Sequence, residues 1–265
     1  GTVQTPFTEY MRMIKTHLKK SVMAVSLLTG LMIAQQASAA IALDRTRVVY
    51  NGDEKSVSLN LSNENKKLPY LAQAWMEDAQ GNKITSPFTV LPPVQRVEPG
   101  ARTQVKVQAT PAANALAQDR ETLFYFNLRE IPPRSNKPNT LQIALQTRII
   151  MFYRPAGIAL DKTEAAGGEW LEKLTLTKNG DQFMVNNPTP YFVTIVEGGP
   201  SVKGTPVGFE PVMVAPKSAA AIKASAAAFG NNPVFSYVND YGGRPKIQFS
   251  CGGATCTGKL VKDTH

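Results

Sequence analysis

Histidine is nearly absent from this 265-residue chain, which has only His17 and the terminal His265. Neither lies in the central part of the sequence, so Ser-His-Asp, Cys-His and histidine-metal chemistry are excluded from a folded core. The sequence also has no Gly-rich phosphate-binding loop followed by Lys and Ser or Thr. We therefore expect no metal, no cofactor and no enzymatic activity, since an enzyme would have to work with carboxylates or lysine alone.

Cysteine is equally scarce, with Cys251 and Cys256 in the stretch CGGATC. Two thiols supply too few ligands for a structural zinc site. In an oxidising compartment, two cysteines that flank four small residues most simply form one local disulfide.

Long hydrophobic runs are missing except for Val22–Ala34, whose 13 residues are fewer than the roughly 20 needed to span a bilayer. A basic stretch precedes this run, and the small-residue motif Ala37–Ala39 follows it. This order is typical of a secretory signal peptide, residues 11–39, cleaved after Ala39. A retained membrane anchor is the weaker alternative. Residues 1–10 precede the first methionine, Met11, and are interpreted as read-through or added sequence.

The formal net charge is +9, with lysines and arginines scattered along the chain and no run of five. A basic protein can bind nucleic acid or acidic surfaces. The scatter favours a solvated basic surface, so we expect no nucleic acid and no membrane as partner once the signal peptide is removed.

Short alternating runs separated by Gly, Pro and Asn dominate the rest of the sequence, and helical periodicity is nearly absent. They predict an all-β fold of short strands typical of sandwiches. The texture changes after Arg154-Pro155, which predicts two domains, residues 40–158 and 159–265. Predicted strands are 45–50, 57–61, 70–76, 103–109, 122–129, 141–153, 170–177, 182–186, 191–196, 212–214, 235–237, 246–249 and one after Cys256; a turn or two of helix is expected at 111–118, and 218–228 is ambiguous.

The stretch TLQIALQTRIIMFYRP, residues 140–155, alternates apolar and polar residues and then becomes apolar on both sides. Leu141, Ile143 and Leu145 share one face of the predicted strand. From the residues alone, these side chains belong either to the core of their own domain or to a second protein. The pattern does not decide between the two.

The sequence contains the motifs DRTRVVYNG, LPYLAQAW, PPVQRVEPG, QDRETLFYFNLREIPP, LQIALQTR with FYRP, NPTPYFVT and NDYGGRP. Together these motifs resemble those of the periplasmic pilus-assembly chaperones of Gram-negative bacteria, closest to the P-pilus type. The resemblance covers the whole chain from Ala40 onward. It implies two immunoglobulin-like β-sandwiches arranged as an L, a periplasmic location, and no nucleotide.

This resemblance implies that Leu141, Ile143 and Leu145 fill the groove of an incomplete pilus subunit, by donor-strand complementation. The chaperone would then deliver the subunit to an outer-membrane usher. Without a subunit, the same strand is expected to allow self-association. The rival interpretation is an immunoglobulin-like pilus subunit or adhesin, although such a protein would lack the second sandwich.

The resemblance also implies that an arginine and a lysine bind the C-terminal carboxylate of the subunit in the interdomain cleft. The arginine corresponds to Arg47, which from sequence alone could equally be a surface residue. The family's lysine position is Ile150 here, so the expected second charge is missing. Arg148, two residues upstream on the same side of the strand, is the candidate for this second charge.

Glu121, Arg154 and Asp240 match family positions that form interdomain salt bridges. The two acids could also suggest a glycosidase pair. They stand beside strand motifs with no sign of a substrate pocket, so we expect a structural role.

Overall fold

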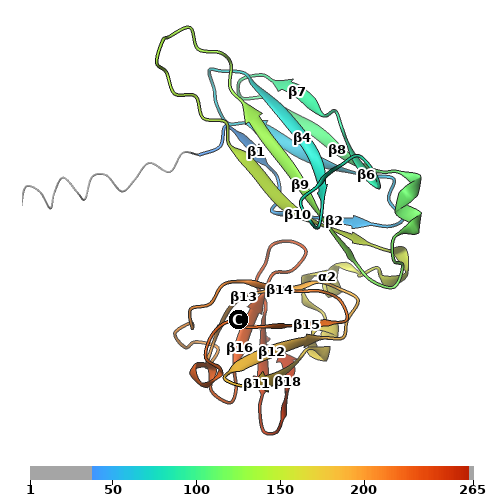
Figure 1. Cartoon of the computed structure of the whole chain (residues 1–265), viewed down its shortest axis with the longest axis vertical. Coiled ribbons are helices and arrows are strands. Elements are labelled where there is room, and N and C mark those ends of the chain that lie inside the picture. The colour runs from blue at the N-terminus through green and yellow to red at the C-terminus, as the bar shows by residue number, and fades with distance from the viewer. Residues whose placement is uncertain (1–37, 263–265) are drawn as a thin grey trace, which may run out of the picture. The chain divides into compact units, whose positions relative to one another are not determined.

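The computed structural model describes residues 38–262, and these residues form two β-sandwiches (Figure 1). The upstream segment 1–10 and nearly all of the predicted signal peptide lie outside the described residues. Within the described part, no helix is long and apolar enough to cross a membrane.

The first sandwich packs two sheets face to face. One sheet has the order β1-β3-β8-β6 and the other the order β2-β10-β9-β4-β5, with β7 also paired to β4. Alternate residues of both sheets point inward, and the largest fully buried side chains include Tyr50, Phe88, Phe126 and Met151. The strands are β1 (Ile41–Leu43), β2 (Arg47–Asn51), β3 (Ser56–Asn63), β4 (Tyr70–Asp78), β5 (Lys83–Ile84), β6 (Phe88–Leu91), β7 (Val94–Val97), β8 (Arg102–Ala109), β9 (Thr122–Ile131) and β10 (Gln146–Arg154).

The second sandwich is one continuous ladder of eight strands in the order β14-β13-β16-β17-β18-β11-β12-β15. Its first and last strands are separated by only three residues of chain, 215–217. A cluster of phenylalanines, including Phe183, Phe229, Phe235 and Phe249, fills the core. The strands are β11 (Thr175–Asn179), β12 (Gln182–Asn187), β13 (Val193–Gly199), β14 (Val212–Val214), β15 (Ser218–Ala221), β16 (Val234–Tyr237), β17 (Lys246–Ser250) and β18 (Thr255–Leu260).

Helical structure is short. The expected turn of helix after Pro111 is confirmed as η1 (Pro111–Ala115), and the ambiguous alanine-rich stretch contains β15 and then η4 (Ala226–Phe229). The other helical elements are η2 (Ala156–Ile158), α2 (Lys162–Gly167) and η3 (Glu169–Lys173).

The prediction of a strand from Trp170 is wrong, because α2 and η3 occupy residues 162–173 and β11 begins only at Thr175. The local sequence explains the helix. The side chain of Asp161 accepts a hydrogen bond from the Glu164 N–H and the Glu164 side chain bonds back to the Asp161 N–H, which is a capping box. The indole Nε1 of Trp170 then donates to the Glu164 carbonyl at 3.0 Å.

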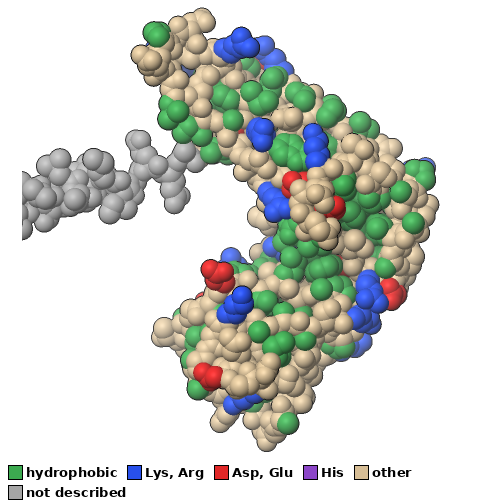
Figure 2. All heavy atoms as spheres, viewed as in Figure 1, with side chains coloured by type: hydrophobic (Ala, Val, Ile, Leu, Met, Phe, Trp, Pro, Cys, Tyr) green, Lys and Arg blue, Asp and Glu red, His purple; other side chains and the backbone are tan. Residues whose placement is uncertain are grey.

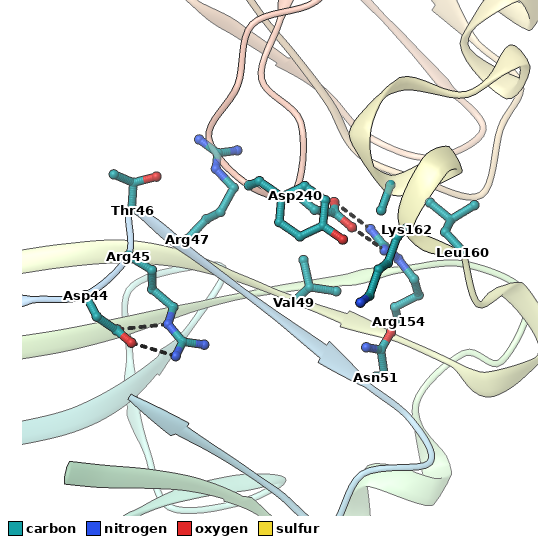
Figure 3. A pocket seen from close by; sticks show the side chains of 12 residues that line it. Asp44, Arg45, Thr46, Arg47, Val49, Asn51, Arg154, Leu160, Lys162 and Asp240 are labelled. Atoms are coloured by element: carbon teal, nitrogen blue, oxygen red, sulfur yellow. Dashed lines mark hydrogen bonds and ion pairs between the residues drawn. The ribbon is translucent and has the colours of Figure 1, made fainter. Parts of the chain in front are cut away.

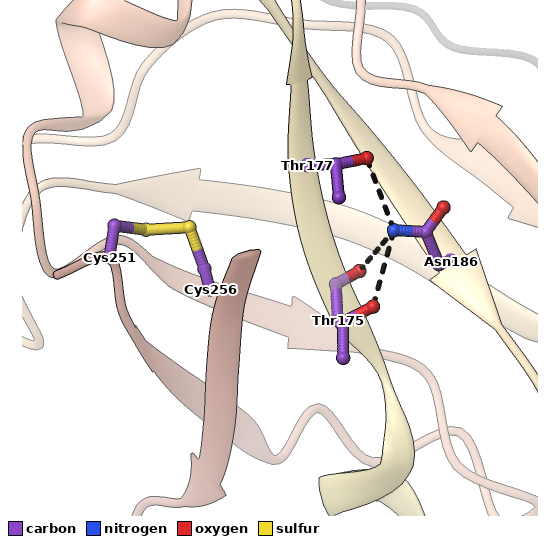
Figure 4. Close-up of a disulfide and its surroundings, with 5 residues drawn as sticks. All are labelled: Thr175, Thr177, Asn186, Cys251 and Cys256. Atoms are coloured by element: carbon purple, nitrogen blue, oxygen red, sulfur yellow. Dashed lines mark hydrogen bonds between the residues drawn. A yellow bond between two sulfur atoms is a disulfide. The ribbon is translucent and has the colours of Figure 1, made fainter. Parts of the chain in front are cut away.

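The prediction of a disulfide is confirmed, since Cys251 and Cys256 are bonded to each other between β17 and β18 (Figure 4). The bond joins the ends of neighbouring antiparallel strands of the second sandwich. Basic side chains are dispersed over the visible face of the molecule in Figure 2, as their scatter in the sequence predicts.

Candidate functional site

The segment that leads into β10 is apolar and exposed. Leu141 is 83% exposed and Ile143 is 55% exposed, while Leu145 is half-buried. The prediction of a strand from Leu141 is wrong in its start, because β10 begins at Gln146. Only Leu145 is tied to the sheet, where its carbonyl accepts a hydrogen bond from the Glu130 N–H at 3.0 Å. The interpretation that Leu141 and Ile143 belong to their own core is therefore wrong.

The edge of β10 beside this segment is open. On one side β10 pairs with β9 from Gln146 to Tyr153, but on the other side it pairs with β2 only from Ile150 to Arg154. The chain that precedes β2 cannot close the gap, since β1 pairs with β3 in the opposite sheet. In the part of the chain that the structure describes, residues 146–149 thus have no strand on their second side (Figure 1). Unpaired strand edges are templates for pairing with another chain.

Arg47, the first residue of β2, lies directly opposite Ile150 in the parallel pairing of β2 with β10. Its side chain is half-buried, and its buried Nε has no hydrogen-bond partner among the described residues. Burial lowers the pKa of Arg47, because the charged form loses water, and the negative charge of Asp240 partly opposes this. A buried donor without a partner is well suited to receive an anionic ligand.

Arg47 lines a pocket of about 690 Å³ (Figure 3). Two of its cations are already neutralised by ion pairs, Arg45 by Asp44 and Arg154 by two carboxylates. Arg47 and Lys162 also line the pocket, and neither forms an ion pair with any residue between 38 and 262. The pocket therefore has two cations outside any ion pair, which in the view of Figure 3 lie on either side of Asp240.

Sequence reasoning misses Lys162 and Tyr241 as pocket residues. Lys162 begins α2 within a polar stretch that has the composition of an ordinary loop between domains, so no signal in the sequence indicates that it lines a pocket. Tyr241, 65% exposed, belongs to the motif NDYGGRP, and that motif is the signal that could have pointed to it.

Arg148 is engaged elsewhere on the sheet. Its Nε donates to Glu77 Oε1 at 3.0 Å, and its guanidinium lies 3.7 Å from the centre of the Tyr125 ring. Glu77 is held in turn by Asn127, whose Nδ2 donates to the same oxygen at 2.8 Å. Arg148 does not line the pocket that contains Arg47. The structure thus brings Arg47 and Ile150 together but gives Arg148 a different partner.

Glu121, Arg154 and Asp240 form one network, in which Glu121 and Arg154 are buried and Asp240 is half-buried. Arg154 Nε donates to Glu121 Oε2 at 2.9 Å, and its terminal nitrogens donate to both oxygens of Asp240 at 2.6 and 3.0 Å. The other oxygen of Glu121 accepts the N–H of Phe192 at 2.7 Å. These contacts join the first sandwich, through Glu121 and Arg154, to Phe192 and Asp240 of the second.

Burial dominates the ionisation of this network. It raises the pKa of Glu121 to about 7, because the carboxylate loses its water and the attraction of Arg154 only partly offsets the loss. For Arg154, burial alone would lower the pKa, but the two carboxylates raise it above its ordinary value. Arg154 therefore remains charged, and Glu121 is the member of the network that titrates near neutral pH.

Comparison with known proteins assigns the chain to a class. A family model described as the PapD N-terminal domain of pili and flagellar-assembly chaperones matches residues 40–159, and one for the PapD C-terminal domain of pili assembly chaperones matches residues 169–249. The chain belongs to this family of pilus-assembly chaperones of the chaperone-usher pathway, which are not enzymes.

Individual relatives agree with this assignment. The chaperone protein PapD of Escherichia coli is 51% identical over 234 residues, which cover 88% of this chain and 95% of PapD. The crystal structure of the periplasmic chaperone SfaE has a TM-score of 0.63 at 29% identity and covers 78% of this chain and 98% of SfaE. The SafB chaperone, solved with the SafA pilin of Salmonella enterica, has a TM-score of 0.65 at 23% identity over 82% of this chain and 98% of that chain. The two sandwiches are immunoglobulin-like, as in these chaperones.

Proposed function

We propose that this chaperone binds pilus subunits in the periplasm by lending them the segment Leu141–Leu145 together with the open edge of β10. The observation that carries the proposal is the exposure of Leu141 and Ile143 beside a strand edge that β2 leaves unpaired. A subunit strand added at this edge gains backbone hydrogen bonds that do not depend on its sequence, while the alternate apolar side chains fix the register.

Hydrophobic burial supplies the energy. Full burial of Leu141, Ile143 or Leu145 contributes roughly 1.5 to 3 kcal/mol each to binding, before the costs of association. The same exposed segment and edge support self-association when no subunit is present. Delivery of the subunit to an outer-membrane usher completes the proposed role, and release would follow exchange for a better-fitting strand from another subunit.

Arg47 is the proposed anchor for the C-terminal carboxylate of the subunit. A buried guanidinium nitrogen without a partner and a pocket with excess positive charge both favour a carboxylate. Ile150 stands where the family has a lysine, so Arg47 acts without a second cation on the opposite strand. For Arg148 to serve as that cation, its guanidinium must leave Glu77 and Tyr125. Its contacts therefore favour Arg47 as the main anchor.

Glu121, Arg154 and Asp240 have the proposed role of interdomain salt bridges that hold the two sandwiches together. Breaking a buried ion pair by removing one partner leaves an uncompensated charge. The network therefore supports the pocket rather than binding the subunit, since Arg154 already has its carboxylates.

The test is subunit capture by the variant Ile143→Asp, with Gln142→Asp as the matched control. Both variants add one negative charge to the same exposed segment, but only Ile143 is proposed to enter the apolar groove. Co-purification of subunits from periplasm should be lost for Ile143→Asp and kept for Gln142→Asp, with unchanged thermal unfolding for both. Equal capture by the two variants would refute the proposal.

A further inference from the structure

Glu130 near the end of β9 is a buried carboxylate without a cation. It is 4% exposed, and its Oε2 accepts hydrogen bonds from the backbone N–H of Ala40 at 2.7 Å and of Ile41 at 3.1 Å. No lysine or arginine of the described chain forms an ion pair with it. A buried carboxylate is costly unless it is paired with a positive charge.

The position of the Ala40 backbone nitrogen is fixed by the start of β1 and not by the residues that precede it. The Ala40 carbonyl accepts the N–H of Glu64 at 2.7 Å, and Ile41 pairs with Asn63 at the start of the β1–β3 ladder. The side chain of Ile41 is buried at 2% exposure. The position of the Ala40 nitrogen beside Glu130 therefore persists whether or not residues 1–39 are attached.

The predicted cleavage after Ala39 changes the chemistry of this nitrogen. Water hydrolyses the Ala39–Ala40 peptide bond in the active site of a signal peptidase, so the new carboxylate leaves with the signal peptide and the Ala40 amide becomes an amine. That amine takes a proton from solvent at neutral pH. The first residue matched by the family model is also residue 40.

We propose that the α-ammonium of Ala40, created by removal of the signal peptide, forms a buried ion pair with Glu130. The missing cation of Glu130 is thus the mature N-terminus itself. Processing would convert a neutral N–H···carboxylate bond into a charge-assisted one, which is shorter and about twice as strong. The mature first sandwich would then be more stable than the precursor form.

The ion pair would also affect the segment Leu141–Leu145, because Glu130 is hydrogen-bonded to the residue where that segment joins the sheet. Glu130 also donates its backbone N–H to the carbonyl of Leu145, where the exposed segment joins the sheet. The ion pair would therefore hold the end of β9 against the start of β1, next to the point where the segment Leu141–Leu145 joins the sheet. The ion pair would form in the unbound chaperone, and its formation does not depend on subunit binding.

The direct test is the pKa of the α-amino group in the mature chain from Ala40 to His265, measured by the pH dependence of selective amine labelling. The ion pair should raise this pKa above the ordinary range of about 7.7 to 8.0. The acidic groups at this position are Glu130 on β9 and Glu64 after β3. We expect Glu130→Gln to return the pKa to its ordinary range, while the control Glu64→Gln leaves it raised. An ordinary pKa in the unsubstituted mature chain would overturn the proposal, even if Glu130→Gln failed to fold.

A second test compares the mature chain with a chain extended by Ser38 and Ala39, in which the nitrogen of residue 40 is an amide. In the mature chain, Glu130→Gln should increase the unfolding equilibrium constant about tenfold at pH 7. In the extended chain the same substitution should leave it unchanged or reduce it. A raised pKa also predicts that the advantage of the mature chain is present near neutral pH, where the amine and the carboxylate are both charged, and disappears as the pH rises through the pKa of the amine. An equal penalty in both chains, or a periplasmic protein whose N-terminal sequence does not begin at Ala40, would overturn the proposal.

Discussion

Two halves of one alternating segment differ in what covers them. Leu141 and Ile143 are 83% and 55% exposed, whereas Ile149, Met151 and Tyr153 are 8%, 0% and 4% exposed. All five positions have the same parity, so an uninterrupted strand would place them on one face. The buried half faces the opposite sheet, where Tyr153 lies 5.6 Å from Phe88 between ring centres. The alternation therefore fixes the face of a side chain, but burial requires a second layer that extends far enough to cover it.

Truncation within each half gives the largest expected difference. Met151→Ala removes a fully buried side chain and should reduce the free energy of unfolding by about 2 to 5 kcal/mol. Leu141→Ala should change it by less than about 0.5 kcal/mol, because the side chain is exposed. Urea unfolding of both variants checks this contrast. A loss above about 1.5 kcal/mol for Leu141→Ala would mean that the exposed half packs against its own domain.

The pocket beside the buried half gives the next effect, on binding rather than folding. Arg47→Ala should weaken subunit binding by about 2 to 5 kcal/mol, since the carboxylate of the subunit would be left without its main cation. Arg148→Ala should weaken it by less than about 1 kcal/mol, because the guanidinium already pairs with Glu77 and does not line the pocket that contains Arg47. Titration with a subunit whose C-terminal carboxylate is intact measures both. Equal losses would instead make Arg148 the second cation.

Ile150→Lys tests the same pocket by adding the lysine that the resemblance to pilus-assembly chaperones implies at this position. Because Ile150 lies opposite Arg47 and is only half-buried, the lysine should tighten subunit binding without unfolding the domain. Tighter binding together with a normal melting temperature would support the carboxylate anchor. A large drop in melting temperature with no gain in affinity would show that Ile150 is needed as a core residue.

The most gradual effect is the pH dependence of stability that comes from Glu121, the partner of Arg154 at the end of β10. The pKa of Glu121 is raised from 4.5 to about 7 in the folded state, so its contribution to stability is fully present below about pH 4.5 and is lost as the pH rises through 7. The stability of the protein relative to Glu121→Gln should fall between about pH 4.5 and 7, by at most about 1.4 kcal/mol per pH unit, and level off at higher pH. Urea midpoints at four pH values give this difference. A flat or rising difference would contradict the raised pKa.

Much of the fold could be predicted from sequence because strands and turns have local signals. Alternation located most strands of both sandwiches to within a few residues, and two cysteines around a short turn predicted the disulfide. The capping box of α2 was also present in the sequence, in the spacing of Asp161 and Glu164, and sequence reasoning missed it.

The rest depends on contacts between distant residues, which no local pattern reports. β10 begins at Gln146 because its pairing with β9 begins there, opposite Arg129, and the residues 141–145 themselves do not indicate this. The partners of Arg148 lie on β4 and β9, and Lys162 reaches the pocket from the second sandwich. Glu130 accepts a hydrogen bond from Ala40, which lies 90 positions earlier in the chain, so only the folded structure shows this contact.

The proposed function requires that the segment Leu141–Leu145 becomes a strand when a subunit binds. Amide hydrogen exchange of this segment measures whether it does. In the free chaperone its amides should exchange rapidly, because the structure pairs none of them within the sheet. In the purified complex with a subunit, protection should appear from residue 141 through 149 while β9 keeps the protection it already has. Rapid exchange of residues 141–145 in a saturated complex would show that this segment does not form a strand with the subunit.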